Sequence, residues 1–199
     1  MWSSARCFCA GSPPVSAVES GDDELVVTAR SGSDLWRTTA YGFVHDNGHA
    51  LLAPMPDPGA VEVTFRADLP DLYDLYDLAG VLLRVDTDTW LKAGVESTDG
   101  AWHLGAVVTR GVSDWSLAPV PDWQGREVTV RASRTGDAVT IRARVAGEPW
   151  RTVRLAPFPV GAAVLAGPMC CSPQSPGARV CFTRFAMGAA DEDLHTSPG

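Results

Sequence analysis

The sequence is poor in several common residue types. Its 199 residues include one lysine, Lys92, one asparagine, Asn47, and one isoleucine, Ile141, while arginine, alanine, glycine, aspartate and valine are abundant. A GC-rich genome produces this bias, which places arginine wherever arginine will serve. A lysine that remains suggests that a slim, single-point cation is needed at its position, because the guanidinium of arginine is a broad planar fork. Chance survival of Lys92 is the alternative.

The chain also lacks an excess of positive charge and any long apolar run. Its formal net charge is -8 and its pI is about 4.9. Nucleic-acid binding requires a basic surface, so no nucleic-acid partner is expected. No stretch approaches the length of a membrane span, so no membrane partner is expected. The segment MWSSARCFCAGSPPVS has no apolar region after its single arginine, which favours a cytoplasmic protein over a secreted one.

Metal-ligand patterns are equally scarce. There are five cysteines: Cys7, Cys9, Cys170, Cys171 and Cys181. They form no CxxC pair and the four histidines are scattered, so neither a metal nor another cofactor is expected. An odd cysteine count fits reduced thiols that pack as small apolar residues. His45 and His49 flank Asn47-Gly48, where a metal site is the weaker alternative to the hairpin turn that Asn-Gly favours.

Alternation of apolar and polar residues is what the sequence has in abundance. Nine short alternating runs are separated by turn-forming residues. They span 24–30, 61–68, 80–86, 89–97, 103–110, 127–133, 138–145, 150–157 and 178–187. No amphipathic helix is visible, so fewer than about one residue in ten should be helical. The pattern predicts an all-β sandwich or barrel, with one domain over 1–187 and a polar C-terminal tail over 188–199 that frays.

The hairpin around Lys92 can be aligned from its apolar residues. Odd-numbered residues are apolar in both 81–85 and 91–95. Directly opposed residues share a face of a sheet, so a three-residue loop at 86–88 is needed to bring the two apolar sets together. The predicted pairs are then Leu83 with Leu91, Val81 with Ala93, and Ala79 with Val95.

The other face of this hairpin carries Trp90, Lys92 and Glu96, and Gly80 opposite Gly94 leaves a shallow floor. Lys92 and Glu96 are four strand residues apart, roughly 13 Å at about 3.3 Å per residue, so they are not expected to form a direct ion pair. An aromatic ring, a cation and a carboxylate over a flat floor are typical of a sugar-binding surface. The alternative is a solvated outer face of the sandwich.

The motifs of this region resemble those of a known family. YDLAGVLLRVDTDTWLKAGVE (76–96), the following DG, and VVTRGVSDWS (107–116) are similar to the family called domain of unknown function 1349, also labelled regulation-of-enolase-like. Its upstream and closing patterns are matched by SDLWRTTAYGFVHDNGH (33–49), GPMCCSP (167–173) and VCFTRFAM (180–187). The resemblance covers the chain from about residue 8 to about residue 187. It implies a concanavalin A-like fold of the lectin/glucanase superfamily, a jelly-roll of two antiparallel sheets.

The resemblance also implies that the polar motif residues lie on the concave sheet or at its rim. The ligand-binding residues implied in this way are Trp36, Arg37, Tyr41, Asp77, Trp90, Lys92, Glu96, Thr109, Asp114 and Trp115. One position departs from the family pattern, since a glutamine usually stands where this chain has Leu78. The register places Leu78 opposite Glu96, and a leucine cannot hydrogen-bond that carboxylate as a glutamine could.

A catalytic role finds limited support. Glycosidases need two carboxyl groups about 5 to 9.5 Å apart, and retaining members of the superfamily place both on one strand. Around Glu96 those partner positions hold Leu91 and Lys92, so Asp77 and Asp114 remain as partners from other segments. The SDWS motif lacks the G-x-S-x-G context of a serine nucleophile. Its aspartate is better interpreted as closing a turn, and Trp115 beside it as either a core residue or a stacking platform.

A binding module is therefore the favoured class. The sequence predicts a carbohydrate or small polar ligand held on the concave face, with no catalytic residues. A glycosidase-type hydrolase and a regulatory protein-binding module of carbohydrate metabolism are the alternatives. The oligomeric state stays open, a homodimer included. An unpaired buried cation is costly, so the Lys92 ammonium is expected to pair with Asp77 or Asp114 at the base of a polar pocket.

Overall fold

The computed structural model describes residues 13–20, 24–69 and 76–196. Strands dominate these ranges, and the helical element among them is one short 3-10 turn, η2 (Pro121–Trp123). The all-β prediction is therefore confirmed. No helix in the described part of the chain is long and apolar enough to cross a membrane.

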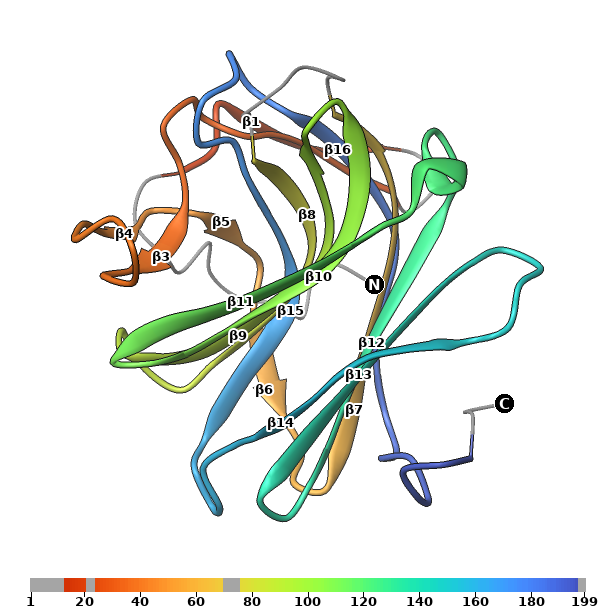
Figure 1. Cartoon of the computed structure of the whole chain (residues 1–199). Coiled ribbons are helices and arrows are strands. Elements are labelled where there is room, and N and C mark those ends of the chain that lie inside the picture. Colours follow the sequence, from red (N-terminus) through yellow and green to blue (C-terminus); the bar gives the residue numbers. More distant parts are fainter. Residues whose placement is uncertain (1–12, 21–23, 70–75, 197–199) are drawn as a thin grey trace.

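The strands form two antiparallel sheets that pack face to face (Figure 1). The first, called here the β7 sheet, has the order β1 (Ser16–Glu19), β2 (Leu25–Thr28), β16 (Arg179–Gly188), β7 (Gly59–Asp68), β12 (Val128–Thr135), β13 (Ala138–Val145), β14 (Arg151–Pro157). The second, the β9 sheet, has the order β11 (Val112–Pro119), β10 (Ala101–Arg110), β9 (Thr89–Thr98), β8 (Asp77–Arg84), β15 (Val164–Cys171), β5 (His49–Ala50), with β6 (Ala53–Met55) also pairing with β15. This is the predicted sandwich of two antiparallel sheets.

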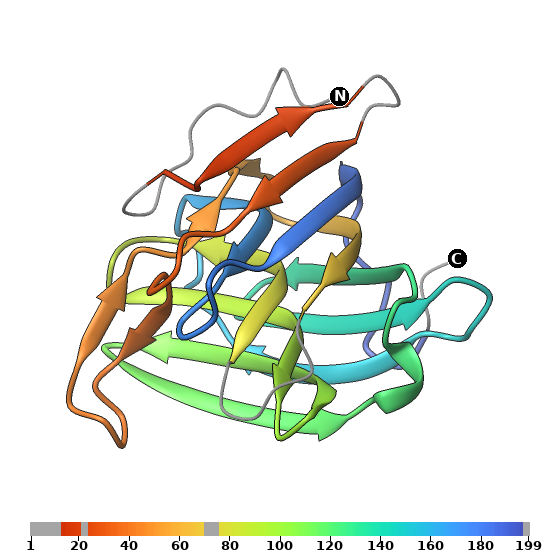
Figure 2. The same cartoon turned by 90° about the horizontal axis from the view of Figure 1, so that it is seen from above.

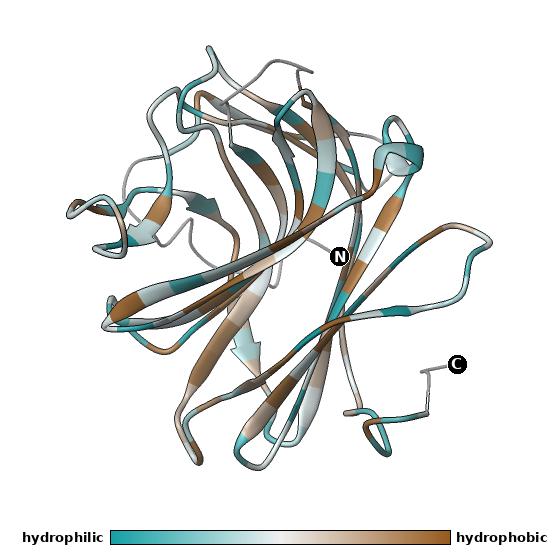
Figure 3. Cartoon of the chain, viewed as in Figure 1, coloured by the Kyte–Doolittle hydropathy of each residue, from teal (hydrophilic) through white to brown (hydrophobic). Residues whose placement is uncertain are grey.

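The core lies between the two sheets and is built from alternate residues of each strand. Figure 3 shows apolar and polar bands following one another along the strands. Val63 and Phe65 of β7, for example, belong to the same buried cluster as Val81 and Leu83 of β8. Apolar residues at every second position can fill such a layer, because successive residues of a strand point to opposite faces.

The register of the β8–β9 hairpin agrees with the prediction. Leu83 lies opposite Leu91 and Val81 lies opposite Ala93. The amide of Val85 donates a hydrogen bond to the carbonyl of Thr89 at 3.0 Å, which closes the loop at 86–88. Even-numbered residues therefore face away from the core, as the alternation requires.

A small hairpin covers part of that outer face. Strands β3 (Leu35–Arg37) and β4 (Val44–Asp46) pair with each other and lie on the side of the β9 sheet that faces away from the β7 sheet (Figures 1 and 2). A second buried apolar cluster forms beneath it, consisting of Leu35, Trp36, Ala50, Leu52, Leu78, Leu82, Trp90, Val107, Met169 and Cys171. The outer face near Trp90 is thus a second core and not a solvated surface.

Four strands of the β9 sheet were not predicted: β5, β6, β11 and β15. β15 has no clean alternation, because six of its eight residues are buried in an unbroken run. β11 contains SDWS, and Asp114 pairs with Val108 of β10 within the ladder. The prediction that Asp114 closes a turn is therefore wrong, since the strand continues through it.

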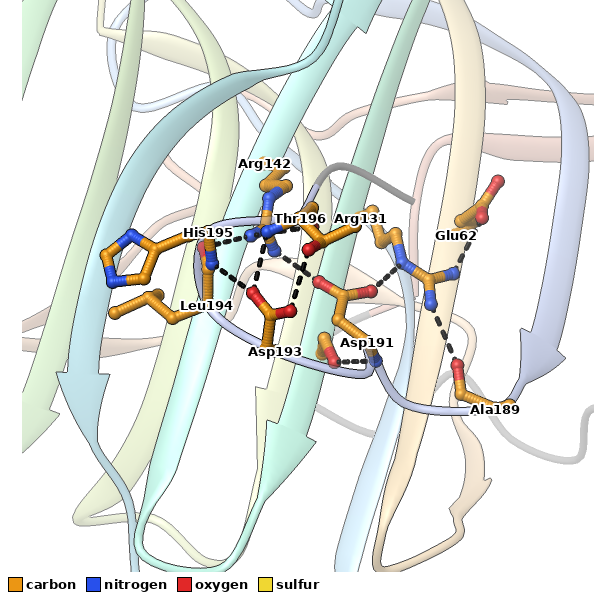
Figure 4. A network of polar contacts seen from close by, with 10 residues as sticks. Glu62, Arg131, Arg142, Ala189, Asp191, Asp193, Leu194, His195 and Thr196 are labelled. Carbon is orange, nitrogen blue, oxygen red and sulfur yellow. Dashed lines mark hydrogen bonds and ion pairs between the residues drawn. The ribbon is translucent and has the colours of Figure 1, made fainter. Parts of the chain in front are cut away.

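The C-terminal segment also departs from its prediction. Asp191 forms ion pairs with Arg131, at 2.7 Å, and with Arg142, and its backbone amide donates a hydrogen bond to Ser133 Oγ at 2.8 Å (Figure 4). Arg131 also donates to the carbonyl of Ala189. Residues 189–196 are thus held against β12 and β13, because buried arginines on those strands need a carboxylate partner. The prediction that the tail frays is wrong for these residues.

Candidate functional site

A pocket of about 510 Å³ opens on the outer face of the β9 sheet beside the β3–β4 hairpin. Its lining combines aromatic and charged side chains, and we call it the outer pocket. It is lined by Asp34, Trp36, Tyr41, Phe43, Tyr76, Lys92, Glu96, Val107, Trp115, Pro173 and Gln174. Five of the ten sequence-predicted ligand residues belong to this set: Trp36, Tyr41, Lys92, Glu96 and Trp115.

Lys92 lies at the base of the outer pocket and is almost fully buried, with 4 % of its surface exposed. The strand alternation directs it away from the main core, between Leu82 of β8 and Val107 of β10. Its ammonium contacts Asp34 Oδ1 at 2.9 Å. The prediction of a carboxylate partner for Lys92 is thus confirmed. The prediction that the partner is Asp77 or Asp114 is wrong, because the segment that leads into the β3–β4 hairpin places Asp34 next to Lys92.

Asp34 is positioned by the segment that contains the single asparagine of the chain. Its backbone amide donates to Asn47 Oδ1 at 2.9 Å, and its carbonyl accepts from the amides of Asn47 and Gly48. Asn47-Gly48 therefore connects β4, which pairs with β3, to β5, which pairs with β15. It does not close the tight hairpin that its sequence favours.

The ion pair keeps both of its groups charged. Burial would raise the pKa of Asp34, but the Lys92 ammonium and the hydrogen bond from the Leu35 amide lower it below its ordinary value. Burial would also lower the pKa of Lys92, but the Asp34 carboxylate raises it above its ordinary value. A charge of each sign thus remains at the pocket base, with the two charges cancelling one another.

Glu96 is the third charged group of the outer pocket, and its environment is different. It is 4 % exposed, and burial raises its pKa to about 7 in spite of the opposing effect of Lys92. The Asp34 carboxylate raises it further, and a hydrogen bond with the Trp115 side chain lowers it. No ion pair joins Glu96 to Lys92 in the described residues, as expected. Leu78, the residue that departs from the family pattern, lies directly opposite Glu96 as predicted.

Aromatic rings form the walls of the outer pocket. The ring of Trp36 lies 5.8 Å from Tyr41 and 6.2 Å from Trp115, at interplanar angles of 62° and 88°. Tyr76 lies 6.1 Å from Trp115 at 69°, and Phe43 stacks on Tyr41. Trp115 is 37 % exposed and Tyr41 is 58 % exposed, so Trp115 is a wall of the pocket rather than a core residue.

Trp90 does not reach the outer pocket. It is 1 % exposed and packs within the second apolar cluster beneath the β3–β4 hairpin. Its predicted place on an open surface is wrong, because the hairpin covers that part of the sheet.

Three further predicted residues lie near the pocket but outside it. Arg37 forms an ion pair with Asp88 at 3.0 Å. The buried hydroxyl of Thr109 is 2.9 Å from that of Ser113. Asp114 forms an ion pair with Arg154 at 2.8 Å. Each side chain is thus engaged in holding a strand or loop and does not line the pocket.

Asp77 is fully buried at the start of β8. It accepts a hydrogen bond from Ser172 Oγ at 3.0 Å, and the pKa of its carboxyl is raised by burial against the opposing effects of Ser175 and Ser172. The backbone amide of Ser172 also donates a hydrogen bond to Ser33 Oγ, which attaches the segment before β3 to the segment after β15. The position of Asp77 points to a structural role in joining β8 to the segment after β15.

Gly80 and Gly94 lie opposite one another, as predicted, and are followed across the sheet by Gly105. A Cβ on Gly80 would lie 2.0 Å from the carbonyl oxygen of Ala93, and one on Gly94 would lie 2.0 Å from that of Ala79. The two backbones thus approach too closely for any side chain, which explains glycine at both positions.

Sequence reasoning did not find several pocket residues. They are Asp34, Phe43, Tyr76, Val107, Pro173 and Gln174. Asp34 and Phe43 fall within the upstream motif at 33–49, and that motif was the available signal. What the motif cannot show is that its hairpin folds over the face that carries Lys92, 58 residues away from Asp34 along the chain.

The described residues contain no cluster of three or more potential metal ligands. Cys171 is buried with its thiol 3.7 Å from Asp34 Oδ1, and burial raises the pKa of the Cys170 thiol to about 12. Both thiols therefore stay protonated, and they pack as the predicted small apolar residues. Cys7 and Cys9 lie outside the described residues.

Known proteins share this fold and much of this sequence. The chain is 37 % identical over 157 residues to "Regulation of enolase protein 1" of Saccharomyces cerevisiae, which covers 79 % of this chain and 77 % of that one. A crystal structure of a functionally unknown protein from the same yeast superposes with a TM-score of 0.84 at 32 % identity, over 94 % of this chain and 97 % of that chain.

A more distant likeness concerns the fold alone. A xylan beta-1,4-xylosidase from Bacillus halodurans superposes with a TM-score of 0.62 at 14 % identity, over 82 % of this chain and 32 % of that enzyme. The sandwich is thus of the kind found in glycoside hydrolases. The family described as "Protein of unknown function (DUF1349)" matches residues 12–190. With that match spanning nearly the whole sandwich, and with the yeast relative similar over most of its length, the chain belongs to the DUF1349 family.

Proposed function

We propose that the chain binds a carbohydrate or another small polar metabolite in the outer pocket, without breaking a bond in it. The observation that carries this proposal is the combination of aromatic walls and a charged base in one pocket of about 510 Å³. Small-molecule sites have volumes of about 300 to 1,000 Å³ and are lined by apolar groups with a few fixed polar ones.

The two kinds of lining residue suit the two kinds of surface on a sugar. Aromatic rings such as Trp36 and Trp115 offer flat faces for the apolar side of a sugar ring. Lys92 and Asp34 offer a donor and an acceptor for hydroxyl groups. Because these two side chains already hold each other at 2.9 Å, little side-chain entropy would be lost when a ligand binds.

The arrangement of Asp34 supports binding without catalysis. Its Oδ1 accepts hydrogen bonds from the Lys92 ammonium and from the Leu35 amide. A base that takes a proton from water or from a substrate would have to weaken this ion pair, which stabilises the ionised form of Asp34.

A glycosidase-type hydrolase is the second candidate, and one observation favours it. Asp34 and Glu96 line the same pocket, and their environments displace their pKa values in opposite directions, with that of Glu96 raised to about 7. Pairs of carboxyl groups divide acid and base roles in this way. In such an enzyme Glu96 would be the general acid.

We also propose a cytoplasmic location. It is supported by the free thiols of Cys170 and Cys171, which are adjacent and buried, because thiols persist unpaired in a reducing compartment.

The binding proposal is tested by titration calorimetry with a panel of neutral mono- and oligosaccharides. Trp115→Ala should weaken binding by about tenfold or more, because aromatic residues at the centre of a site contribute most of its affinity. The matched control is Trp150→Ala, since Trp150 packs on Arg144 away from the outer pocket. Failure of every saccharide to bind, or equal affinities for wild type and Trp115→Ala, would contradict the proposal.

The same kind of comparison between wild type and a variant tests the second candidate, hydrolysis. Aryl glycosides are incubated with wild type and with Glu96→Gln, and release of the aryl alcohol is followed by absorbance. Release by wild type that Glu96→Gln abolishes would replace binding without catalysis by hydrolysis.

A further inference from the structure

The outer pocket has an unbalanced charge. Of its three charged lining residues, Lys92 and Asp34 neutralise one another at 2.9 Å. Glu96 receives a hydrogen bond from the neutral Trp115 side chain, and no cation lies within ion-pair distance of it among the described residues. When Glu96 is ionised, the pocket therefore contains one buried carboxylate without a counter-ion. Such a group is costly unless a ligand supplies the missing charge.

The aromatic walls line the same pocket as this carboxylate. Trp115 stands at 88° to Trp36 and at 69° to Tyr76, and Trp36 stands at 62° to Tyr41. Rings that line one pocket at such steep angles present their faces and edges from different directions. The face of an aromatic ring is its negative region, so rings arranged around a space attract a cation placed between them.

The rim of the pocket is exposed to an unusual degree for apolar residues. Tyr41, Phe43 and Trp115 are 58 %, 42 % and 37 % exposed. Adjacent exposed aromatic rings are a feature of ligand sites, because their area is removed from water only when a ligand binds. The uncompensated carboxylate and the exposed rings are independent observations, and both lie in the same pocket.

We propose that the outer pocket binds the ammonium group of a small ligand, an amino sugar or a quaternary ammonium compound, with Glu96 as its counter-ion and the rings of Trp36 and Trp115 around it. The inference rests on the proposed binding function and names the chemical class of its ligand. Lys92 does not oppose a cation, because the Asp34 carboxylate at 2.9 Å cancels its charge. An anionic ligand is disfavoured, since it would face the Glu96 carboxylate with no free cation to bind it.

The test compares ligands that differ in charge but hardly in shape. Choline is measured against its uncharged isostere 3,3-dimethylbutan-1-ol, and glucosamine against glucose, by titration calorimetry at about pH 7. A cation between aromatic rings in a desolvated site gains about 2 kcal/mol or more, so at least one charged ligand should bind about tenfold or more tightly than its neutral partner. The pair that shows the preference identifies the source of the ammonium group.

Glu96→Gln serves as the first variant, because it removes the charge and keeps the shape. It should abolish the preference for the charged ligand over its neutral partner. The matched control is Asp122→Asn, which removes a carboxylate from the exposed η2 turn away from the pocket. It should leave both affinities unchanged.

Affinity for choline, whose charge does not depend on pH, should also rise with pH as Glu96 ionises. The groups near Glu96 are Lys92 on the same strand, His103 opposite it on β10, Cys171 on β15, Asp34 and Trp115. The profile is therefore repeated with His103→Gln, which should retain the rise, and with Glu96→Gln, which should lose it.

The outcomes separate this inference from the function on which it rests. Equal affinities within both ligand pairs, or a preference that persists in Glu96→Gln, would overturn the inference and leave the saccharide-binding proposal standing. Binding of neutral saccharides together with no binding of choline or glucosamine would do the same. If no ligand of either panel binds, the proposed function and the inference fall together.

Discussion

The ion pair between Lys92 and Asp34 should contribute strongly to stability, and Lys92→Met tests this. Lys92 is 4 % exposed and the Asp34 side chain is 17 % exposed. Removing one partner of a buried pair costs about 3 to 5 kcal/mol, because the other charge is left uncompensated. Asp34 would keep its hydrogen bond from the Leu35 amide and its opening to the pocket. We therefore expect a loss near the lower end, about 3 kcal/mol.

The loss should depend on pH in a defined direction. In the wild type the pKa of Asp34 is lowered, so the stabilisation by the pair is present above the ordinary value of about 3.8 and is lost as pH falls through the folded pKa. In Lys92→Met, burial becomes the main influence and raises the pKa of Asp34, so protonation relieves the unpaired charge. The difference between wild type and variant should thus shrink as pH falls, first through the raised pKa of the variant and then through the lowered pKa of the wild type.

Urea unfolding followed by tryptophan fluorescence measures these free energies across the pH range. Asp34→Asn and the double variant complete a cycle, in which the double variant should lose less than the sum of the single losses. Arg66→Met is the matched control, because Arg66 and Glu24 form an exposed pair at 2.6 Å whose removal should cost less than about 1 kcal/mol. A loss below about 0.5 kcal/mol for Lys92→Met at neutral pH would refute the reasoning.

Lys92→Arg separates shape from charge at the same position. The space between Leu82 and Val107 accepts the narrow lysine stem, and the larger guanidinium should cost about 1 to 3 kcal/mol by overpacking. Wild-type stability for Lys92→Arg would show that the lone lysine survived by chance.

Three further predictions concern other parts of the chain. The pKa of Glu96 is raised to about 7 from 4.5, so the neutral form stabilises the fold below about pH 4.5 and this contribution disappears as pH rises through about 7. Glu96→Gln should therefore match wild type in unfolding free energy at pH 4 and exceed it by about 3 kcal/mol above pH 8, and equal values at both pH values would contradict the assigned pKa. Gly94→Ala should cost about 3 kcal/mol or more in thermal unfolding, because its Cβ would lie 2.0 Å from a backbone oxygen, whereas Gly188→Ala, with open space at its Cβ, should be nearly neutral. Asp191→Ala should release the C-terminal segment and lower stability by about 3 kcal/mol, since it leaves the buried Arg142 without its carboxylate and Arg131 with Glu62 alone. Hydrogen exchange at the backbone amide of residue 191, which donates to Ser133 Oγ, should accelerate there but not in Asp193→Ala, which removes only bonds to His195 and Thr196.

Alternation along the strands determined much of the fold from the sequence. The nine predicted runs all became strands, and the β8–β9 register followed from matching two apolar faces. These features are local, since a strand's period of two sets which residues share a face. β15 was not predicted because its buried run has no alternation, and β11 was not predicted because SDWS resembles a turn.

The same local rule placed Lys92, Glu96 and Trp90 on one face correctly. It could not predict that the three side chains have different environments. The β3–β4 hairpin buries Trp90 in a second apolar cluster, brings Asp34 to Lys92 and leaves Glu96 beside the open pocket. Which segment covers a sheet face depends on contacts between distant parts of the chain, and alternation within a strand does not record them.

The sequence by itself thus determined the sandwich, the hairpin register and the charged character of the site. The tertiary structure alone decided the partner of Lys92, the pKa of Glu96 and the enclosure of the pocket. The physical reason is that side-chain direction follows from backbone geometry residue by residue, whereas burial, ion pairing and desolvation arise only when the 33–49 segment packs across β9, β10 and β11.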